Sequence, residues 1–162
     1  MTKFVSQKIR QRSGARLAAV QATYMAHFGE LPVDQVIEDF KQGKIGRFVI
    51  DEDNLTQTEE MVEISPIDIE YFTNLVKGVH QKKESLEKSL NLYLNEKWDF
   101  DKMNGIMQAI LLCAVYELTY TLDIDTKVLI QEYVDLAYAF FEKNEPKMIN
   151  ALLDQIAHAV RR

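Results

Sequence analysis

Apolar residues recur every three or four positions over most of this chain, which is the period of an amphipathic helix. Such stripes predict helices over about residues 6–28, 33–40, 66–79, 84–94, 104–121, 128–141 and 146–156. Residues 104–121 are apolar around much of the helix circumference, and a helix of that kind usually lies at the centre of a bundle. The pattern therefore predicts about seven helices in a single all-α domain.

Prolines and glycines punctuate this helical pattern. All three prolines stand where a helix is expected to begin. Ser65, Pro66 and Asp68 match an N-cap, a first-turn proline and a first-turn acidic residue. The stretch 43–64 breaks the pattern with two glycines, a short GRFVI segment and an acidic run. We expect one long loop there, with room for an extended piece.

Length and composition fit one globular domain over residues 1–162. With 47% hydrophobic and 27% charged residues, the chain does not belong to a disordered or low-complexity class. Its single cysteine, Cys113, cannot form an intramolecular disulfide, which is typical of a cytoplasmic protein. The sequence has no apolar run long enough to span a bilayer, and its first residues lack the apolar block of a secretory signal. We therefore expect a cytoplasmic protein with no membrane contact.

The net charge of −6 conceals an uneven distribution. The first 29 residues contain five basic residues and no acidic one, and the remaining 14 basic and 25 acidic residues leave −11. A basic arm on an acidic body indicates contact with a polyanion or an acidic partner through the arm alone.

The motifs of common enzyme and metal sites are absent from the sequence. It contains no GxGxxG, GxxxxGK[ST] or HExxH, and its three histidines are far apart along the chain. Cys113 falls in the most apolar helix, where a thiol is usually a small core residue. The run Asp51–Asp53 lacks the glycine and the terminal glutamate of a calcium loop. We expect no catalytic residue, no metal site and no cofactor, so the protein is not expected to be an enzyme.

The basic arm has the spacing of a helical ridge. Lys8, Arg12 and Arg16 are four residues apart, so on a helix they occupy one face that can follow a phosphate backbone. Tyr24 lies two turns further on, and an aromatic ring beside arginines can stack on an unpaired base. The alternative is a solvated basic face with Tyr24 in the core.

Three blocks of sequence resemble the NusB family in the same order and spacing. They are ARLAAVQATY (15–24), WDFDKMNGIMQAILLCAVYEL (98–118) and KVLIQEYVDLAYAFFEKNEPKMINALLDQIA (127–157). The first resembles the family's AR-x-x-A-x-Q-x-x-Y, the second its W…IL-x-x-A-x-YEL, and the third its V-x-INE-x-V-x-LAK-x-F followed by K-FVN-x-VLD. The resemblance covers residues 9–160, nearly the whole chain.

This resemblance implies a fold of two packed helical groups and a bacterial transcription antitermination factor. Members bind the boxA element of ribosomal RNA leader transcripts together with NusE, a ribosomal protein, and act on RNA polymerase with other Nus factors. Some members form homodimers and others do not, which leaves the oligomeric state open.

The resemblance also implies binding residues. RNA contacts carry over to Arg12 and Arg16 on the basic first helix and to Lys147 and Asn150 in the last block. Charge and spacing alone add two further RNA-binding candidates, Lys8 and Arg10. Met107 occupies a position where the family often presents an acidic residue to NusE, and Ser13 and Gly14 replace arginines that many members carry.

Two other hypotheses remain open at this point. The chain can be a helical protein-interaction module of the same fold that has lost most RNA binding. It can also be a fragment of an enzyme, because this helical domain precedes some ribosomal RNA methyltransferases. The enzyme hypothesis requires a Rossmann-like domain with a glycine-rich turn, which these 162 residues lack.

Overall fold

The computed structural model describes residues 7–43, 48–53, 58–63, 67–95 and 97–161. Within them the chain forms six α-helices, a 3₁₀ helix and a β-hairpin. The elements are α1 (Gln7–Phe28), α2 (Val33–Lys41), β1 (Phe48–Asp53), β2 (Thr58–Glu63), α3 (Ile69–Tyr93), η1 (Phe100–Lys102), α4 (Gly105–Tyr120), α5 (Thr126–Tyr138) and α6 (Asn144–Val160). In this part of the chain, no helix has both the length and the apolar character needed to cross a membrane.

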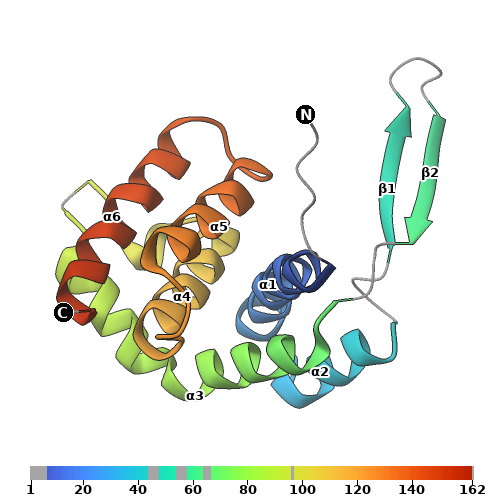
Figure 1. The fold of residues 1–162 in the computed structure, drawn as a ribbon, viewed down its shortest axis with the longest axis horizontal. Coiled ribbons are helices and arrows are strands. Elements are labelled where there is room, and N and C mark those ends of the chain that lie inside the picture. The colour runs from blue at the N-terminus through green and yellow to red at the C-terminus, as the bar shows by residue number, and fades with distance from the viewer. Residues whose placement is uncertain (1–6, 44–47, 54–57, 64–66, 96, 162) are drawn as a thin grey trace.

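The helices form two packed groups around α4 (Figure 1). Helices α1 and α2 lie with α3 on one side, and α5 packs along α6 on the other. Helix α4 contacts α1, α3, α5 and α6, and eleven of its sixteen residues are buried. A helix that is apolar all round is stable only when its whole circumference is covered, so the central position expected for residues 104–121 is confirmed, as is the helical fold.

Small side chains let α1 approach the centre closely. Ala15, Ala18, Ala19 and Ala22 are all buried, and α1 packs against both α3 and α4. The close approach fixes the orientation of the whole helix, which carries the basic arm at its beginning.

The expected helices at 66–79 and 84–94 are one helix, α3, which explains why there are fewer helices than predicted. Leu75, Val79, Leu86 and Leu90 are buried along its length. The polar stretch between the two apolar stripes contains no proline or glycine. It therefore does not interrupt the helix where α3 passes from one helical group to the other.

Asp68 is the N-cap of α3, instead of the first-turn acidic residue that the sequence predicts. Its carboxylate accepts a hydrogen bond from the Tyr71 backbone N–H at 3.0 Å. Its own backbone N–H donates to the Gln11 carbonyl at 3.1 Å, which ties the start of α3 to α1. Ser65 and Pro66 lie outside the described residues.

Replacing Asp68 by alanine is expected to lower the free energy of unfolding by about 1 kcal/mol, because the capped N–H at the start of α3 loses its acceptor. Chemical denaturation monitored by circular dichroism measures this change. Asp68→Asn is the matched control, since an asparagine oxygen caps nearly as well as a carboxylate. Equal losses in the two variants would show that the charge of Asp68 matters and the cap does not.

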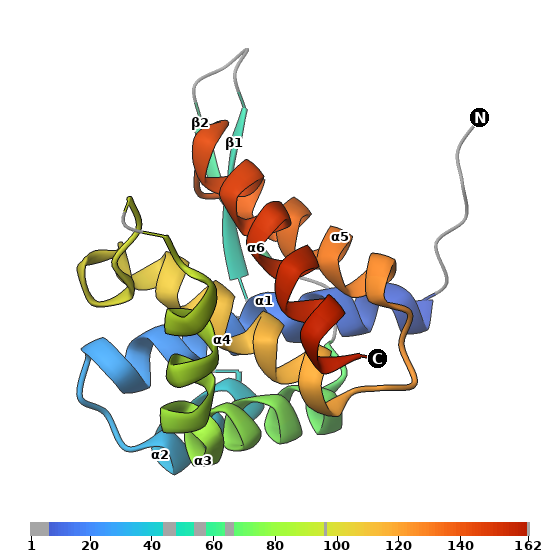
Figure 2. The ribbon, with the colours of Figure 1, turned by 90° about the vertical axis from the view of Figure 1, so that its left-hand side faces the viewer.

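The stretch 43–64 is more regular than the expected loop. Strands β1 and β2 pair in antiparallel register, with Val49 opposite Val62 and Ile50 opposite Met61. The hairpin projects away from the helices (Figure 2). The extended piece expected in this connection is therefore confirmed for residues 48–53, where β-branched and aromatic residues of the short FVI segment favour a strand. The second strand, at residues 58–63, was not predicted.

Candidate nucleic-acid interface and its buried support

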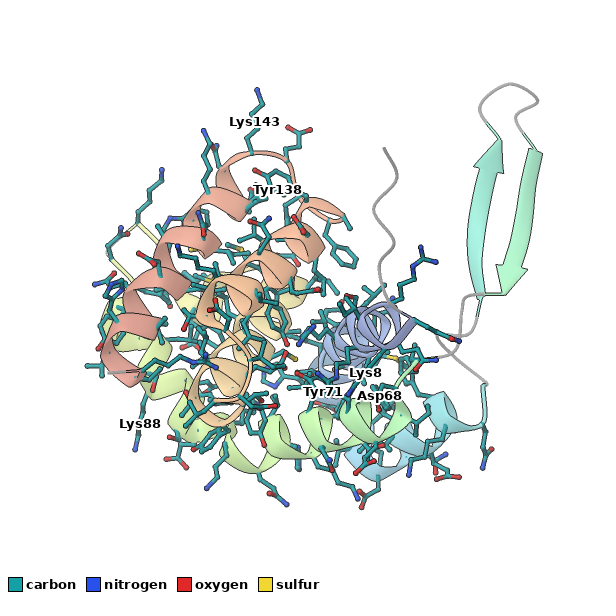
Figure 3. All side chains as sticks on the ribbon, viewed as in Figure 1. Lys8, Asp68, Tyr71, Lys88, Tyr138 and Lys143 are labelled. Carbon is teal, nitrogen blue, oxygen red and sulfur yellow. The ribbon has the colours of Figure 1, made fainter. Side chains whose placement is uncertain are left out.

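The start of α1 carries the exposed part of the predicted RNA site. Lys8 and Arg10 are exposed, and Arg12 is half-buried. The Arg12 guanidinium lies over the Tyr71 ring, 5.3 Å from its centroid, and its buried Nε finds no hydrogen-bond partner among the described residues. Figure 3 shows Lys8 near Tyr71 and Asp68, where the start of α1 meets the start of α3. A cationic surface with an aromatic ring beneath it can hold a phosphate backbone.

Arg16 is not on this surface, so the expectation of three exposed cations in one ridge is wrong. Its side chain is only 4% exposed. The Arg16 Nε donates to Glu117 Oε2 at 2.8 Å, and one Nη donates to the Tyr71 hydroxyl at 2.9 Å. A guanidinium that is buried by helix packing needs such acceptors, and Arg16 therefore supports the interface from beneath.

Glu117 is the centre of a buried polar network that joins four helices. Besides Arg16 from α1, the hydroxyls of Tyr71 from α3 and Tyr133 from α5 donate to its carboxylate through short hydrogen bonds. Glu132 lies at the edge of the network, 3.7 Å from an Arg16 Nη. The network aligns α1 and the start of α3 against α4 and α5, so it fixes where Arg12 and Tyr71 present their side chains.

Burial and the charge of the partner have opposite effects on the pKa values of Glu117 and Arg16. Burial raises the pKa of Glu117 above its usual value, and the positive charge and hydrogen bond of Arg16 oppose that rise. Burial alone would lower the pKa of Arg16, but the charge and hydrogen bond of Glu117 raise it overall. Burial also raises the pKa of Tyr133 well above its usual value, as does the Glu117 charge. Arg16 and Glu117 therefore depend on each other to remain charged in the core.

Ser13 and Gly14, which stand where arginines were expected from the resemblance, both fit their surroundings in the structure. The Ser13 hydroxyl donates to the Glu132 carboxylate at 3.0 Å, which links α1 to α5. A Cβ at position 14 would lie 2.9 Å from the Ile67 Cγ2, which is too close for a comfortable contact. Gly14 therefore fits the close packing of Ile67 against α1, where an arginine has no room for its Cβ.

Lys147 and Asn150 form a second, separate part of the predicted RNA site. Both are exposed on α6, whereas Pro146 and Ile149 bury the opposite face of that helix. Lys143 and Tyr138 mark the nearby end of α5 and the turn into α6, well apart from Lys8 in Figure 3. The structure thus places Lys8, Arg10 and Arg12 on the first turns of α1, with Lys8 and Arg12 on one face, and it places Lys147 and Asn150 on α6.

Met107, the residue predicted to contact the partner, is buried with 2% of its surface exposed. Two exposed aromatic side chains lie near the start of α4: Tyr24 is 38% exposed and Phe28 is 44% exposed, with their ring centroids 5.2 Å apart. A Cβ on Gly105, the first residue of α4, would lie within 3 Å of both rings. The exposure of Tyr24 also shows that the alternative with Tyr24 in the core is wrong.

Among the described residues, we find no arrangement with catalytic or metal-binding character. Cys113 is buried, and burial raises its pKa to about 12, so the thiolate nucleophile does not form near neutral pH. No group of three metal-ligating side chains is present in these ranges.

The sequence alone did not indicate a role for Glu117, Tyr71 or Tyr133, although one feature of the sequence points to Glu117. A carboxylate within the most apolar helix must find a partner if that helix is central. Arg16 is one of the cations on the adjacent helix α1, and its guanidinium pairs with the Glu117 carboxylate. The hydroxyl donors on α3 and α5 follow from tertiary packing, which has no local sequence signature.

Comparison with solved structures defines the class of fold. The chain superposes on the structure of T. maritima NusB with a TM-score of 0.70 and 23% identity, covering 91% of this chain and 90% of that one. It superposes on NusB in a crystal structure of antitermination factors NusB and NusE in complex with dsRNA with a TM-score of 0.72 and 19% identity, covering 93% and 98%. The helical arrangement is therefore the NusB fold.

Sequence comparison then defines the family. The NusB family model matches residues 13–158. The chain is 39% identical over 155 residues to the transcription antitermination protein NusB of Rhodospirillum rubrum, covering 92% of this chain and 84% of the relative. It is 35% identical to the corresponding protein of Novosphingobium aromaticivorans, covering 94% and 96%. The chain belongs to the NusB family.

Proposed function

We propose that this protein is a non-enzymatic RNA-binding antitermination factor that binds boxA-type RNA together with NusE. Its membership of the NusB family carries the proposal, and the exposed cations at the start of α1 supply a surface with the required charge. The protein acts in the cytoplasm and reaches RNA polymerase through the assembled Nus factors.

The RNA backbone follows the start of α1. Lys8 and Arg10 neutralise phosphates, and each contact releases condensed counterions. Arg12 is half-buried over the Tyr71 ring, and its guanidinium offers N–H donors to a phosphate or base oxygen. Lys147 and Asn150 extend the RNA contact over α6, where an amide can read a base edge that a cation cannot distinguish.

NusE covers the aromatic surface formed by Tyr24 and Phe28 at the start of α4. Exposed aromatic side chains in contact with each other are typical of the centre of a protein interface. A cationic partner bound there also neutralises part of the acidic body, which otherwise repels phosphate within a Debye length of about 8–10 Å. The two proteins are therefore expected to bind RNA cooperatively.

Addition of cognate NusE is expected to tighten binding of boxA-type RNA by about tenfold, and by linkage RNA tightens the NusE complex by the same factor. Fluorescence anisotropy of a labelled RNA, titrated with the protein at fixed NusE concentrations, measures both. Phe28→Ala should reduce the cooperative gain while leaving the RNA affinity of the protein alone unchanged.

A scrambled RNA of equal length separates specific binding from charge attraction in the same titration. RNA affinity that is indifferent to NusE contradicts the proposed mechanism. Absence of RNA binding with NusE binding intact supports the interaction module that has lost its RNA function.

A further inference from the structure

A small cavity lies between α1, α2 and α3 and has α4 as part of its floor. Its volume is about 180 Å³. Val76, Val79 and Leu112 line the cavity, and each is at most 2% exposed. The cavity therefore offers an apolar floor to a compact ligand, in the size range of a ring or a short alkyl chain.

Three nitrogen-bearing side chains line the same cavity. His27 comes from α1, and His80 and Lys83 come from α3, so histidines 53 positions apart in the sequence share one site. A neighbouring depression shares His80 and adds Lys77 and the carboxylate of Asp34. Side chains that carry N–H donors over an apolar floor are complementary to a ligand with one anionic end and one apolar end.

Contacts between these groups define which donors are available. The Lys83 ammonium is in short contact with the His27 Nδ1, which accepts a hydrogen bond and leaves the His27 proton on Nε2. Burial, together with the Lys83 charge, lowers the pKa of His27 and so favours this neutral form. Glu87 lies 3.9 Å from the Lys83 ammonium. That separation is longer than the roughly 2.7–3.2 Å of a hydrogen bond, so the ammonium keeps donors for one carboxylate, whereas the Glu87 charge disfavours a dianion such as phosphate.

We propose that this cavity, lined by His27, His80 and Lys83 above Val79 and Leu112, binds a small organic monocarboxylate with a compact apolar body. The carboxylate accepts hydrogen bonds from Lys83 and the imidazoles, and the hydrocarbon part fills the space above α4. The site lies at the opposite end of α1 from Lys8, Arg10 and Arg12, and it requires neither RNA nor NusE.

Titration of the full chain with hexanoate, followed by NMR of the histidine ring protons, tests this site. Saturable shifts of His27 and His80 are expected, with His158 on α6 as an internal reference. Hexanamide has the same hydrocarbon body without the charge, and inorganic phosphate has the charge without the body. Both should bind at least tenfold more weakly than hexanoate.

Two variants keep the test independent of folding. Lys83→Gln, at a side chain that is 35% exposed, should weaken hexanoate binding at least tenfold, whereas Lys88→Gln on the same helix should leave it unchanged. Ala26→Met places a longer side chain in the cavity and should abolish binding. Equal binding of hexanoate and hexanamide, unchanged affinity in Lys83→Gln, or shifts that do not saturate would overturn the proposal.

Discussion

Replacing Arg16 by methionine is expected to lower the free energy of unfolding by about 3–5 kcal/mol, because Glu117 would remain buried without its counter-charge. For a chain of this size that loss corresponds to a fall in melting temperature of roughly 6–20 °C. Chemical denaturation monitored by circular dichroism measures the free energy directly. Methionine retains most of the buried hydrocarbon, so the loss reports the charge and its hydrogen bonds.

The double variant Arg16→Met, Glu117→Leu is the matched control, and it should be less destabilised than Arg16→Met alone, since it removes the unpaired charge. The loss in Arg16→Met should also depend on pH. Without Arg16, burial raises the folded-state pKa of Glu117 further above its unfolded value, so stability falls as the pH rises through that interval. The deficit relative to the parent should therefore shrink when the pH is lowered from 7 to 5. A deficit that stays constant or grows would show that Glu117 is not the group left unpaired.

Charge reversal at Lys8 and Arg10 together is expected to weaken binding of single-stranded boxA-type RNA by about 25-fold at 0.1 M salt, if each residue loses one phosphate contact. The slope of log affinity against log salt should decrease by about 1.4 for the two contacts. Melting temperature should change little, because both side chains are exposed on α1.

Lys88→Glu is the control for general electrostatic repulsion. Lys88 is exposed on α3 and lies away from Lys8 in Figure 3. Its reversal changes the net charge but removes no proposed contact, so the salt dependence should equal that of the parent. Parent-like binding by the Lys8, Arg10 double variant would show that the start of α1 is a solvated basic face.

The helical fold followed from the sequence because its signals are local. The period of apolar residues defined α1, α4, α5 and α6 to within a few residues, and the apolar circumference of α4 predicted its central position. Helix α3 was divided into two because a polar stretch on a bridging helix has the same composition as a linker. The first strand of the β-hairpin was expected as an extended piece, but the second strand was missed, since it contains several glutamates, which are rare in strands.

The candidate site was only partly accessible to sequence reasoning. Spacing of four residues places Lys8, Arg12 and Arg16 along one side of a helix, but it does not reveal where a neighbouring helix begins to cover that side. The start of α3 lies against α1 at Gln11, so Arg16 is covered and Lys8 is not. Likewise, the proximity of His27 to Lys83 arises from helix packing and has no counterpart in the sequence.

The projecting hairpin has a consequence for how copies of this protein meet in solution. Residues 48–63 contain six acidic and no basic residues, so they account for the entire net charge of −6 and the rest of the chain sums to zero. The register pairs Asp51 with Glu60 and Glu52 with Glu59, so four of the six acidic residues fall at paired positions of one two-stranded sheet. Net-charge repulsion between copies of the protein is therefore concentrated on this one projecting element, and the rest of the chain contributes none.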